Sequence, residues 1–190
     1  MKKIILASTS PIRKEMMQQS GLEFMATSPA CDEDKIKAGL KHLSLPDMAL
    51  ELAKAKAKTI SDANPQAYVI GSDQICELES KVISKSKNFE QAFDSLKLLQ
   101  GKTHRQNNGT CIFYNGSLVM EHKEIASLTM KSLRDSEIEH YIHQDNPIGC
   151  AGSYKFELNG YKLFKKIEGS EECIKGFCIS KVIEFLDSNP

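Results

Sequence analysis

The sequence predicts an α/β fold in which helices flank a curved, mixed β-sheet. In the first half of the chain, short β-branched runs alternate with helical segments, whereas the second half is richer in strand-like segments. The strongest apolar run, at residues 68–72, is nearly continuous, as in a central strand covered on both faces. With 190 residues, 41% of them hydrophobic, the chain can enclose a sizeable core. We expect a single domain over residues 1–190.

The chain opens with a predicted strand, loop and helix. Residues 3–6 are apolar and β-branched, and Ser10 and Pro11 provide an N-cap and a first helical residue. The helix ends before a glycine, after which residues 22–26 can form a second strand. The polar segment 28–46 is expected to be a long loop, and loops of that length are often functional.

The middle of the chain alternates helix and strand. Residues 46–60 carry apolar side chains on one face, which is typical of an amphipathic helix. The central strand is expected to end on Asp73, and a short hairpin is expected at residues 79–80. Asn88 is predicted to cap a helix over residues 89–99.

The second half is predicted to be β-rich. Two longer strands flank Asn115 and Gly116, a pair that strongly favours a two-residue hairpin. The elements expected after them are a helix near residues 136–143, a glycine-rich turn over 149–152, strands through Phe164 and a closing helix over 179–186.

The composition excludes several classes of partner. Lysine plus arginine and aspartate plus glutamate each total 25, so the formal net charge is zero and no global basic field favours a polymeric nucleic acid. No apolar stretch reaches transmembrane length, so we expect no membrane partner. The first apolar run is too short for a signal peptide, and the six cysteines contain no CxxC pair. Reduced thiols and a cytoplasmic location are therefore expected.

Several residues can carry chemistry. Ser8 and Arg13 lie around a predicted helix N-terminus, which suits a phosphate, although an ordinary N-cap with a surface arginine is the simpler interpretation. Asp73 follows the most apolar strand, where ligands of α/β sheets collect. Its carboxylate can bind a divalent cation, deprotonate a water or merely cap the strand. Glu33, within the acidic run 32–34, is a second candidate carboxylate or part of a solvated loop.

Six sequence segments, taken in order, form a more specific pattern. They are LASTSPIRKEMM at 6–17, DED at 32–34, LAKAKA at 52–57, VIGSDQICEL at 69–78, the lysine of VISKSK at 85, and CAGSYKFE at 150–157. In order and spacing they resemble the Maf family of nucleotide pyrophosphatases, from Ile4 to about Leu186. The resemblance implies a fold similar to that of inosine-triphosphate pyrophosphatases. It also implies a small-molecule nucleotide substrate, a divalent cation (Mg²⁺, Mn²⁺ or Co²⁺) and a possible homodimer.

The resemblance also assigns roles to residues. It implies that Asp73 is the catalytic proton acceptor. The residues implied to form the surrounding phosphate and metal site are Ser8, Arg13, Glu33, Lys56 and Lys85. Cations aimed at a leaving pyrophosphate lower the barrier to attack on the inner phosphorus, and a carboxylate is needed to hold the metal and activate water. Which of Asp73 and Glu33 is the base and which the ligand stays open.

The resemblance also indicates which nucleotide base the site prefers. Gln74 after the catalytic aspartate, together with the CAGSYKFE segment, is similar to the branch that prefers 7-methyl-GTP. By that resemblance Ile12, Gln74 and Glu157 govern base choice, and a buried or half-buried Glu157 would accept hydrogen bonds from the guanine edge. Ile12 departs from the branch, which commonly has a stacking tryptophan there. Ser86 and the segment 176–178 also depart from the family pattern.

The predicted function is hydrolysis of 7-methyl-GTP, or another modified nucleotide, to the monophosphate and pyrophosphate, which would prevent misincorporation. One alternative is a non-catalytic nucleotide-binding regulator of cell division, but the retained carboxylates and cations favour catalysis. A second alternative is a broader house-cleaning triphosphatase for noncanonical nucleotides, which Ile12 leaves open.

Overall fold

The computed structural model describes residues 2–189, and within them seven strands form one hydrogen-bonded sheet. The strand order is β2-β1-β3-β5-β6-β7, with β4 paired to β3 off this path. The strands are β1 (Lys3–Leu6), β2 (Met25–Ala26), β3 (Ala67–Leu78), β4 (Lys81–Ile83), β5 (Thr103–Tyr114), β6 (Ser117–Met130) and β7 (Phe164–Glu168). β1 runs parallel to β2 and β3, whereas β4 and β7 are antiparallel to their partners, so the predicted mixed sheet is confirmed.

Seven α-helices and one 3-10 helix accompany the strands in the described part of the chain. The helices are α1 (Pro11–Gln19), α2 (Glu33–Gly39), α3 (Leu45–Ala63), α4 (Phe89–Leu99), α5 (Asp135–Asp145), α6 (Glu171–Lys175) and α7 (Ile179–Ser188), and the 3-10 helix is η1 (Gly160–Leu163). None of the described helices is long and apolar enough to span a membrane.

The chain divides into two compact units. The first unit comprises the residues up to 74, residues 108–124 and the residues from 176 onward, and the second comprises residues 75–107 and 125–175. The boundaries at residues 74, 107 and 124 fall inside β3, β5 and β6, so each of these strands contributes to both units. The single domain expected from the sequence stays a prediction.

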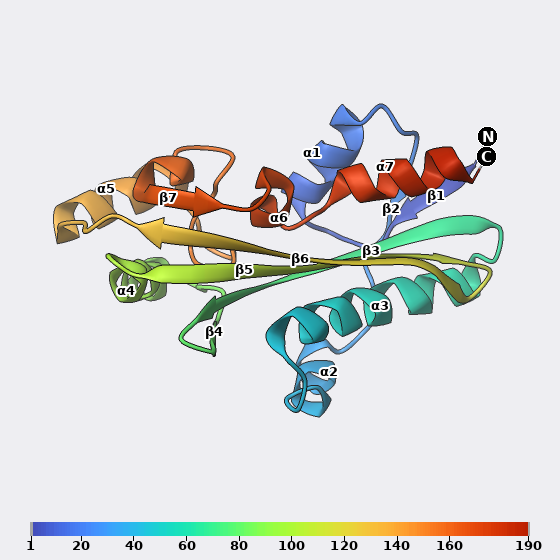
Figure 1. Ribbon diagram of the computed structural model, residues 1–190, viewed down its shortest axis with the longest axis horizontal. Helices are drawn as coiled ribbons and strands as arrows, with labels where there is room; N and C mark the ends of the chain where they lie inside the picture. The colour runs from blue at the N-terminus through green and yellow to red at the C-terminus, as the bar shows by residue number, and fades with distance from the viewer. Residues whose placement is uncertain (1, 190) are drawn as a thin grey trace. The chain divides into compact units, whose positions relative to one another are not determined.

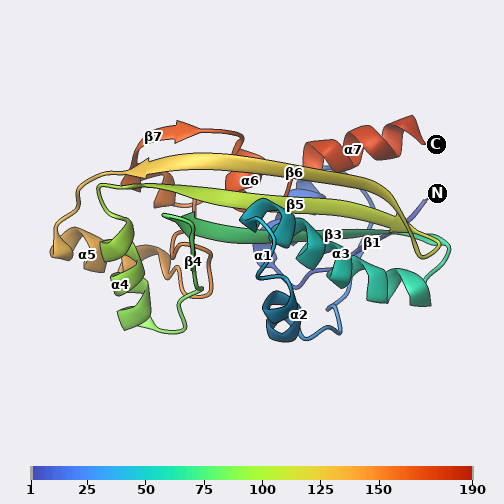
Figure 2. The ribbon, with the colours of Figure 1, turned by 60° about the horizontal axis from the view of Figure 1, so that its bottom comes forward.

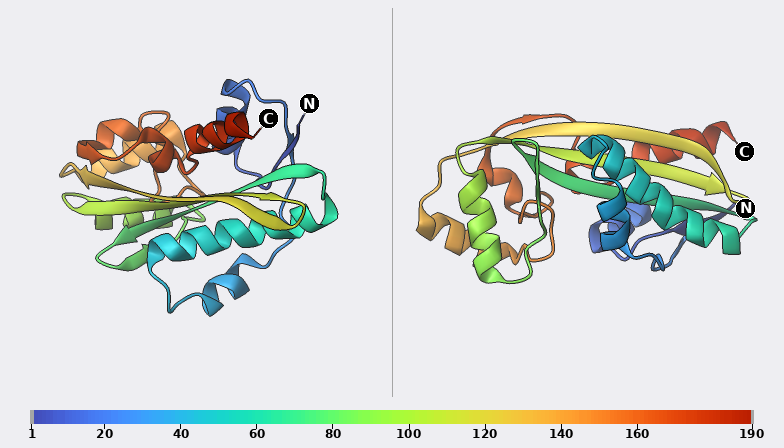
Figure 3. Two further views of the ribbon diagram at one scale, coloured as in Figure 1. Left: turned by 45° about the vertical axis from the view of Figure 1, so that its right-hand side comes forward. Right: turned by 90° about the horizontal axis from the view of Figure 1, so that it is seen from below.

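Helices cover both faces of the sheet in the first unit. α1 and α7 lie on one face and α3 on the other (Figure 1; Figure 3, left). Successive residues of β1 point to opposite faces, and each face has its own apolar core. Ile4 and Leu6 pack with the α1 and α7 side, whereas Ile5 and Ala7 pack with the α3 side. This two-sided burial explains why β1 and the first part of β3, residues 67–71, are nearly continuous apolar runs.

Two glycines let α3 approach the sheet closely. A β-carbon at Gly71 would lie 2.3 Å from the backbone oxygen of Ala53, and one at Gly109 would lie 2.4 Å from the backbone of Leu50. Only glycine fits such contacts without a shift of the helix. The close approach brings the middle of α3 against β3 directly before Asp73.

The prediction that β3 ends on Asp73 is wrong. The strand continues to Leu78, because after its parallel pairing with β1 stops at Ile70 it still pairs with β5 and then with β4. Asp73 therefore lies within a strand, just beyond the carboxyl end of the neighbouring β1. The expected hairpin at residues 79–80 is confirmed, since both have positive φ and Leu78 pairs with Lys81.

The prediction of a structureless loop over residues 28–46 is also wrong, because α2 occupies part of it and packs beside α3 (Figure 2). The Asp32 carboxylate accepts a hydrogen bond from the Lys35 backbone N–H (3.0 Å) and caps this helix. Glu33 and Asp34 occupy its first turn, where negative charge is favourable. The acidic run is therefore a helix start.

Three other local predictions need correction. Ser10 precedes α1, but its side chain makes no capping bond, and the Ser8 hydroxyl accepts from the Ser10 N–H instead (3.1 Å). The second strand is shorter than predicted and spans only Met25–Ala26. The segment before Phe164 is not a strand, because η1 occupies its end and β7 begins at Phe164.

The helices and turns of the second half follow the predictions more closely. In the second unit α4 begins after Asn88, whose side chain accepts from the Gln91 N–H, and α4 packs against α5 (Figure 3, right). In the first unit Asn115 and Gly116 both have positive φ, as their hairpin requires, and α7 closes the chain.

Candidate active site

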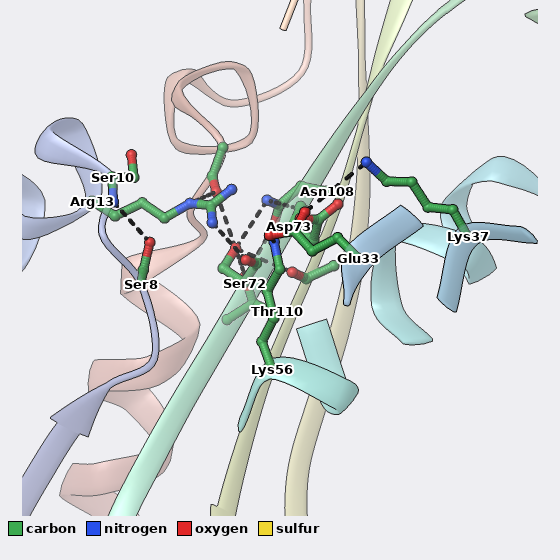
Figure 4. Close-up of polar contacts among 12 residues, drawn as sticks. Ser8, Ser10, Arg13, Glu33, Lys37, Lys56, Ser72, Asp73, Asn108 and Thr110 are labelled. Atoms are coloured by element: carbon green, nitrogen blue, oxygen red, sulfur yellow. Dashed lines mark hydrogen bonds and ion pairs between the residues drawn. The ribbon is translucent and has the colours of Figure 1, made fainter. Parts of the chain in front are cut away.

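A buried lysine joins two carboxylates at the centre of the candidate site. Lys56 Nζ, from α3, lies 2.6 Å from Asp73 Oδ1 on β3 and 3.0 Å from Glu33 Oε1 on α2 (Figure 4). The Lys56 and Asp73 side chains are only 8% and 7% exposed, whereas Glu33 is 39% exposed. A buried ammonium group needs such partners, because desolvation penalises an unpaired charge. Three residues far apart in the sequence thus form one cluster.

The second oxygen of Asp73 makes this cluster a candidate metal site. Asp73 Oδ2 is buried and has no hydrogen-bond partner among the described residues. A buried carboxylate oxygen without a partner costs free energy unless a cation or water satisfies it. Carboxylate oxygens are the ligands that Mg²⁺ and Mn²⁺ prefer, so Asp73 and Glu33 fit a divalent cation chemically.

Arg13 lies next to this cluster and is held by the backbone. Its Nε donates to the Gly176 carbonyl (2.9 Å) and its Nη1 to the Ser72 carbonyl (2.5 Å), so it ties α1 to β3 and to the start of the C-terminal segment (Figure 4). Burial lowers the pKa of the guanidinium, and the carboxylates of Asp73 and Glu33 oppose that shift. Arg13 stays charged at neutral pH because its ordinary pKa is far higher.

A buried polar layer behind Asp73 is a part of the site that sequence reasoning missed. Asn108 Nδ2 donates to the Asp73 backbone oxygen (3.1 Å) and to Ser72 Oγ (3.2 Å), and Thr110 Oγ1 donates to Asn108 Oδ1 (2.9 Å). The signal was present, because residues 103–110 of β5 are all polar apart from Gly109, although six of these eight are buried. Buried polar side chains with satisfied hydrogen bonds fix a single local geometry.

Cys31 is a second residue that was missed. Burial raises the pKa of its thiol, the nearby Glu33 raises it further and Lys56 opposes the shift. Cys31 therefore lies within electrostatic range of the carboxylate cluster. It precedes the cap of α2, so its place follows from the helix that the sequence analysis did not predict.

The remaining candidate residues lie in different places. In the first unit Ile12 is half-buried on α1, and the half-buried Gln74 packs over Gly176, where a β-carbon would lie 2.9 Å from Gln74 Oε1. Lys85 and Glu157 belong to the second unit, and both are exposed. The buried or half-buried carboxylate expected at Glu157 is therefore not observed.

Comparisons with known proteins agree with the fold. A solved structure of a HAM1 protein from Coxiella burnetii has a TM-score of 0.51 and 13% identity, and the match covers 99% of this chain and 98% of that one. At this identity the likeness concerns the fold alone, and it supports the predicted class.

Comparisons of sequence find relatives with higher identity to this chain. A Legionella pneumophila protein named nucleoside triphosphate pyrophosphatase is 35% identical, over 97% of this chain and 92% of its own length. A Bdellovibrio bacteriovorus protein named 7-methyl-GTP pyrophosphatase is 36% identical, over 98% and 97%. The model of the family described as Maf-like protein matches residues 3–189. The chain therefore belongs to the Maf-like protein family.

Proposed function

We propose that this protein is a nucleoside triphosphate pyrophosphatase that prefers 7-methyl-GTP and thereby prevents misincorporation of modified nucleotides. The observation that carries the proposal is the Lys56 cluster, in which one lysine contacts two carboxylates and Asp73 Oδ2 is buried with no hydrogen-bond partner within residues 2–189. Such a cluster combines a cation, a base and metal ligands in one place. The names of the relatives from Legionella and Bdellovibrio support the same reaction.

Each residue of the cluster has a task in this reaction. Asp73 and Glu33 would hold a divalent cation, which when bound neutralises the polyphosphate and lowers the pKa of water. A carboxylate oxygen of the pair that is not bound to the cation accepts the proton of the water that attacks the α-phosphorus. Lys56 and Arg13 offset the negative charge that builds up on the leaving pyrophosphate. Two donors of Arg13 already bond to carbonyl groups, so this residue is preoriented.

The family resemblance also assigns Ser8 and Lys85 to phosphate binding. The Ser8 hydroxyl accepts from the Ser10 N–H at the start of α1, which leaves its own hydrogen available to donate to a phosphate oxygen. Lys85 is exposed, so its contribution would be a screened charge rather than a buried contact. A possible homodimer belongs to the proposal on the same resemblance, and a cytoplasmic location on the reduced thiols expected from the sequence.

Base preference is the finer part of the proposal, and it rests on Ile12, Gln74 and Glu157. The carboxylate of Glu157 would accept from the guanine N–H groups and attract the methylated, cationic ring. Because Glu157 is exposed in the free protein, solvent screening reduces this attraction. We therefore expect its contribution to base preference to lie at the lower end of about 1 to 3 kcal/mol.

A substrate panel tests this preference. The unmutated protein is expected to turn over 7-methyl-GTP with a higher kcat/KM than UTP or dTTP, with pyrophosphate as the product. Glu157→Gln should reduce the 7-methyl-GTP to UTP ratio by roughly fivefold or more while pyrophosphate is still formed. Glu139→Gln, at an exposed glutamate of α5, is the matched control and should leave the ratio unchanged. Equal or better turnover of UTP by the unmutated protein would refute the preference.

A broader house-cleaning triphosphatase is the second candidate. Ile12 favours it, because an aliphatic side chain offers no stacking surface for a cationic purine. The same panel separates the two functions, since the broader enzyme would hydrolyse inosine or other noncanonical triphosphates as well as 7-methyl-GTP. A regulator without catalysis would bind nucleotide and release no pyrophosphate from any of them.

A further inference from the structure

Three side chains with metal-ligating atoms meet at a place outside the Lys56 cluster. His122 and Glu124 are two residues apart on β6, so they point to the same face of the sheet. Cys178 is the residue that precedes α7 on that face. One ligand atom from each residue lies within 4.8 Å of the others. Neither the proposed reaction nor the family resemblance uses any of the three.

The separations fit a single bound ion. His122 Nε2 lies 3.4 Å from Glu124 Oε2, and Cys178 Sγ lies 3.3 Å from the same oxygen. In a tetrahedral zinc site, bonds of about 2.0 Å to nitrogen or oxygen and about 2.3 Å to sulfur place neighbouring ligands roughly 3.3 to 3.5 Å apart. The His122–Glu124 and Cys178–Glu124 distances already match those separations.

The Cys178 sulfur also has two oxygen acceptors within hydrogen-bonding distance but only one hydrogen to donate. Cys178 Sγ lies 3.3 Å from Glu124 Oε2 and 3.2 Å from Asn108 Oδ1. A thiol has one hydrogen, so it can donate fully to only one of these acceptors at a time. A cation bound to the thiolate would interact favourably with Glu124 and could also use the amide oxygen of Asn108.

Solvent can reach the triad through His122. This residue is 28% exposed on its side chain and lines a shallow surface hollow of ≈ 420 Å³ together with Lys181 and Glu184. Lys181 carries a positive charge near the sulfur, but its Nζ is bonded to Glu184 Oε2 at 2.8 Å. The local charge therefore does not exclude a divalent ion, and an entry path exists for it.

We propose that His122, Glu124 and Cys178 form a second metal site, for Zn²⁺ or a similar thiophilic divalent ion. Imidazole, carboxylate and thiolate are the three ligand types of protein zinc sites, whereas the carboxylates of the Lys56 cluster suit harder ions. Three protein ligands leave the fourth position to water or to the Asn108 oxygen. The inference does not depend on the proposed function.

The second site is connected to the candidate active site through Asn108. The Asn108 side chain accepts at Oδ1 from Cys178 and donates at Nδ2 to the backbone oxygen of Asp73. Metal binding removes the thiol hydrogen, so Asn108 loses one donor while its bond to Asp73 stays possible. The two sites are therefore neighbours with separate ligand sets, and variants can distinguish them.

Cobalt spectroscopy of the full-length, reduced and metal-free protein tests the proposal. Titration with Co²⁺ alone should produce a thiolate-to-cobalt charge-transfer band and intense visible bands typical of tetrahedral Co²⁺, and Zn²⁺ should displace both. Cys178→Ser should abolish the charge-transfer band. His122→Gln and Glu124→Gln should each weaken Co²⁺ binding by at least about tenfold, since even outer-sphere changes cost that much.

Two control variants are titrated with Co²⁺ in the same way. Cys150→Ser removes a cysteine outside the triad, and Asp73→Asn alters the carboxylate cluster, so both should retain the band. The proposal is overturned if the unmutated protein shows no band, or if the band survives Cys178→Ser. It is also overturned if neither His122→Gln nor Glu124→Gln changes the affinity. These two positions are partly exposed, so their variants test the site even if Cys178→Ser does not fold.

Discussion

Asp73→Asn is expected to lower kcat/KM at least about a thousandfold and to leave the protein folded. The amide keeps the shape of the carboxylate but can neither accept a proton nor balance the charge of a metal ion. Lys56 keeps Glu33 as a partner in the variant, so no buried charge is left unpaired. The rate is measured as pyrophosphate release, and the fold by circular dichroism and thermal unfolding.

Asp62→Asn is the matched control for this variant. Asp62 lies on α3 and pairs with Lys58, and both side chains are exposed to solvent. Its activity should equal that of the unmutated protein. A folded Asp73→Asn variant with activity within a few-fold of the parent would show that Asp73 has only a structural role.

Lys56→Met is expected to destabilise the protein by about 3 to 5 kcal/mol in urea unfolding and to remove most activity. Methionine preserves the apolar stem of the side chain but leaves the buried Asp73 carboxylate without its partner at 2.6 Å. The penalty comes from the unpaired charge rather than from a cavity. The free energy of unfolding is measured by equilibrium denaturation at neutral pH.

Lys54→Met provides the comparison on the same helix. Lys54 pairs with Glu51 and Glu121, but its side chain is 22% exposed and its partners are more exposed still. Its loss should cost no more than about 1 kcal/mol. The double variant Lys56→Met with Asp73→Asn should be more stable than Lys56→Met alone, because it removes the unpaired charge. Equal stability of Lys54→Met and Lys56→Met would contradict the buried pair.

The parts of the fold that the sequence predicted are those with local signals. β1 and α1 follow from an apolar run and a proline at the first helical position, and the hairpin follows from Asn115 and Gly116. α3 follows from its apolar face. These features are set by neighbouring residues, so they can be recognised without knowledge of the partner strands.

The features that were missed depend on pairing between distant segments. β3 continues beyond Asp73 because β5 and β4 pair with it there. The residues around Asp73 alone do not indicate that pairing. The contact of Glu33 with Lys56 requires α2, which lies in a segment that the sequence predicts to be a long loop. The roles of Asn108 and Thr110 depend on burial beside β3. The resemblance named Glu33, Lys56 and Asp73, but only the structure brings them into contact.

The origin of the oxygen atom in the products tests the central claim most directly. The protein is incubated with a nucleoside triphosphate in water enriched in oxygen-18. The products are then separated, and their masses are measured by mass spectrometry. Attack on the α-phosphorus predicts one labelled oxygen in the nucleoside monophosphate and none in the pyrophosphate. A label in the pyrophosphate, or release of orthophosphate as the first product, would contradict the account.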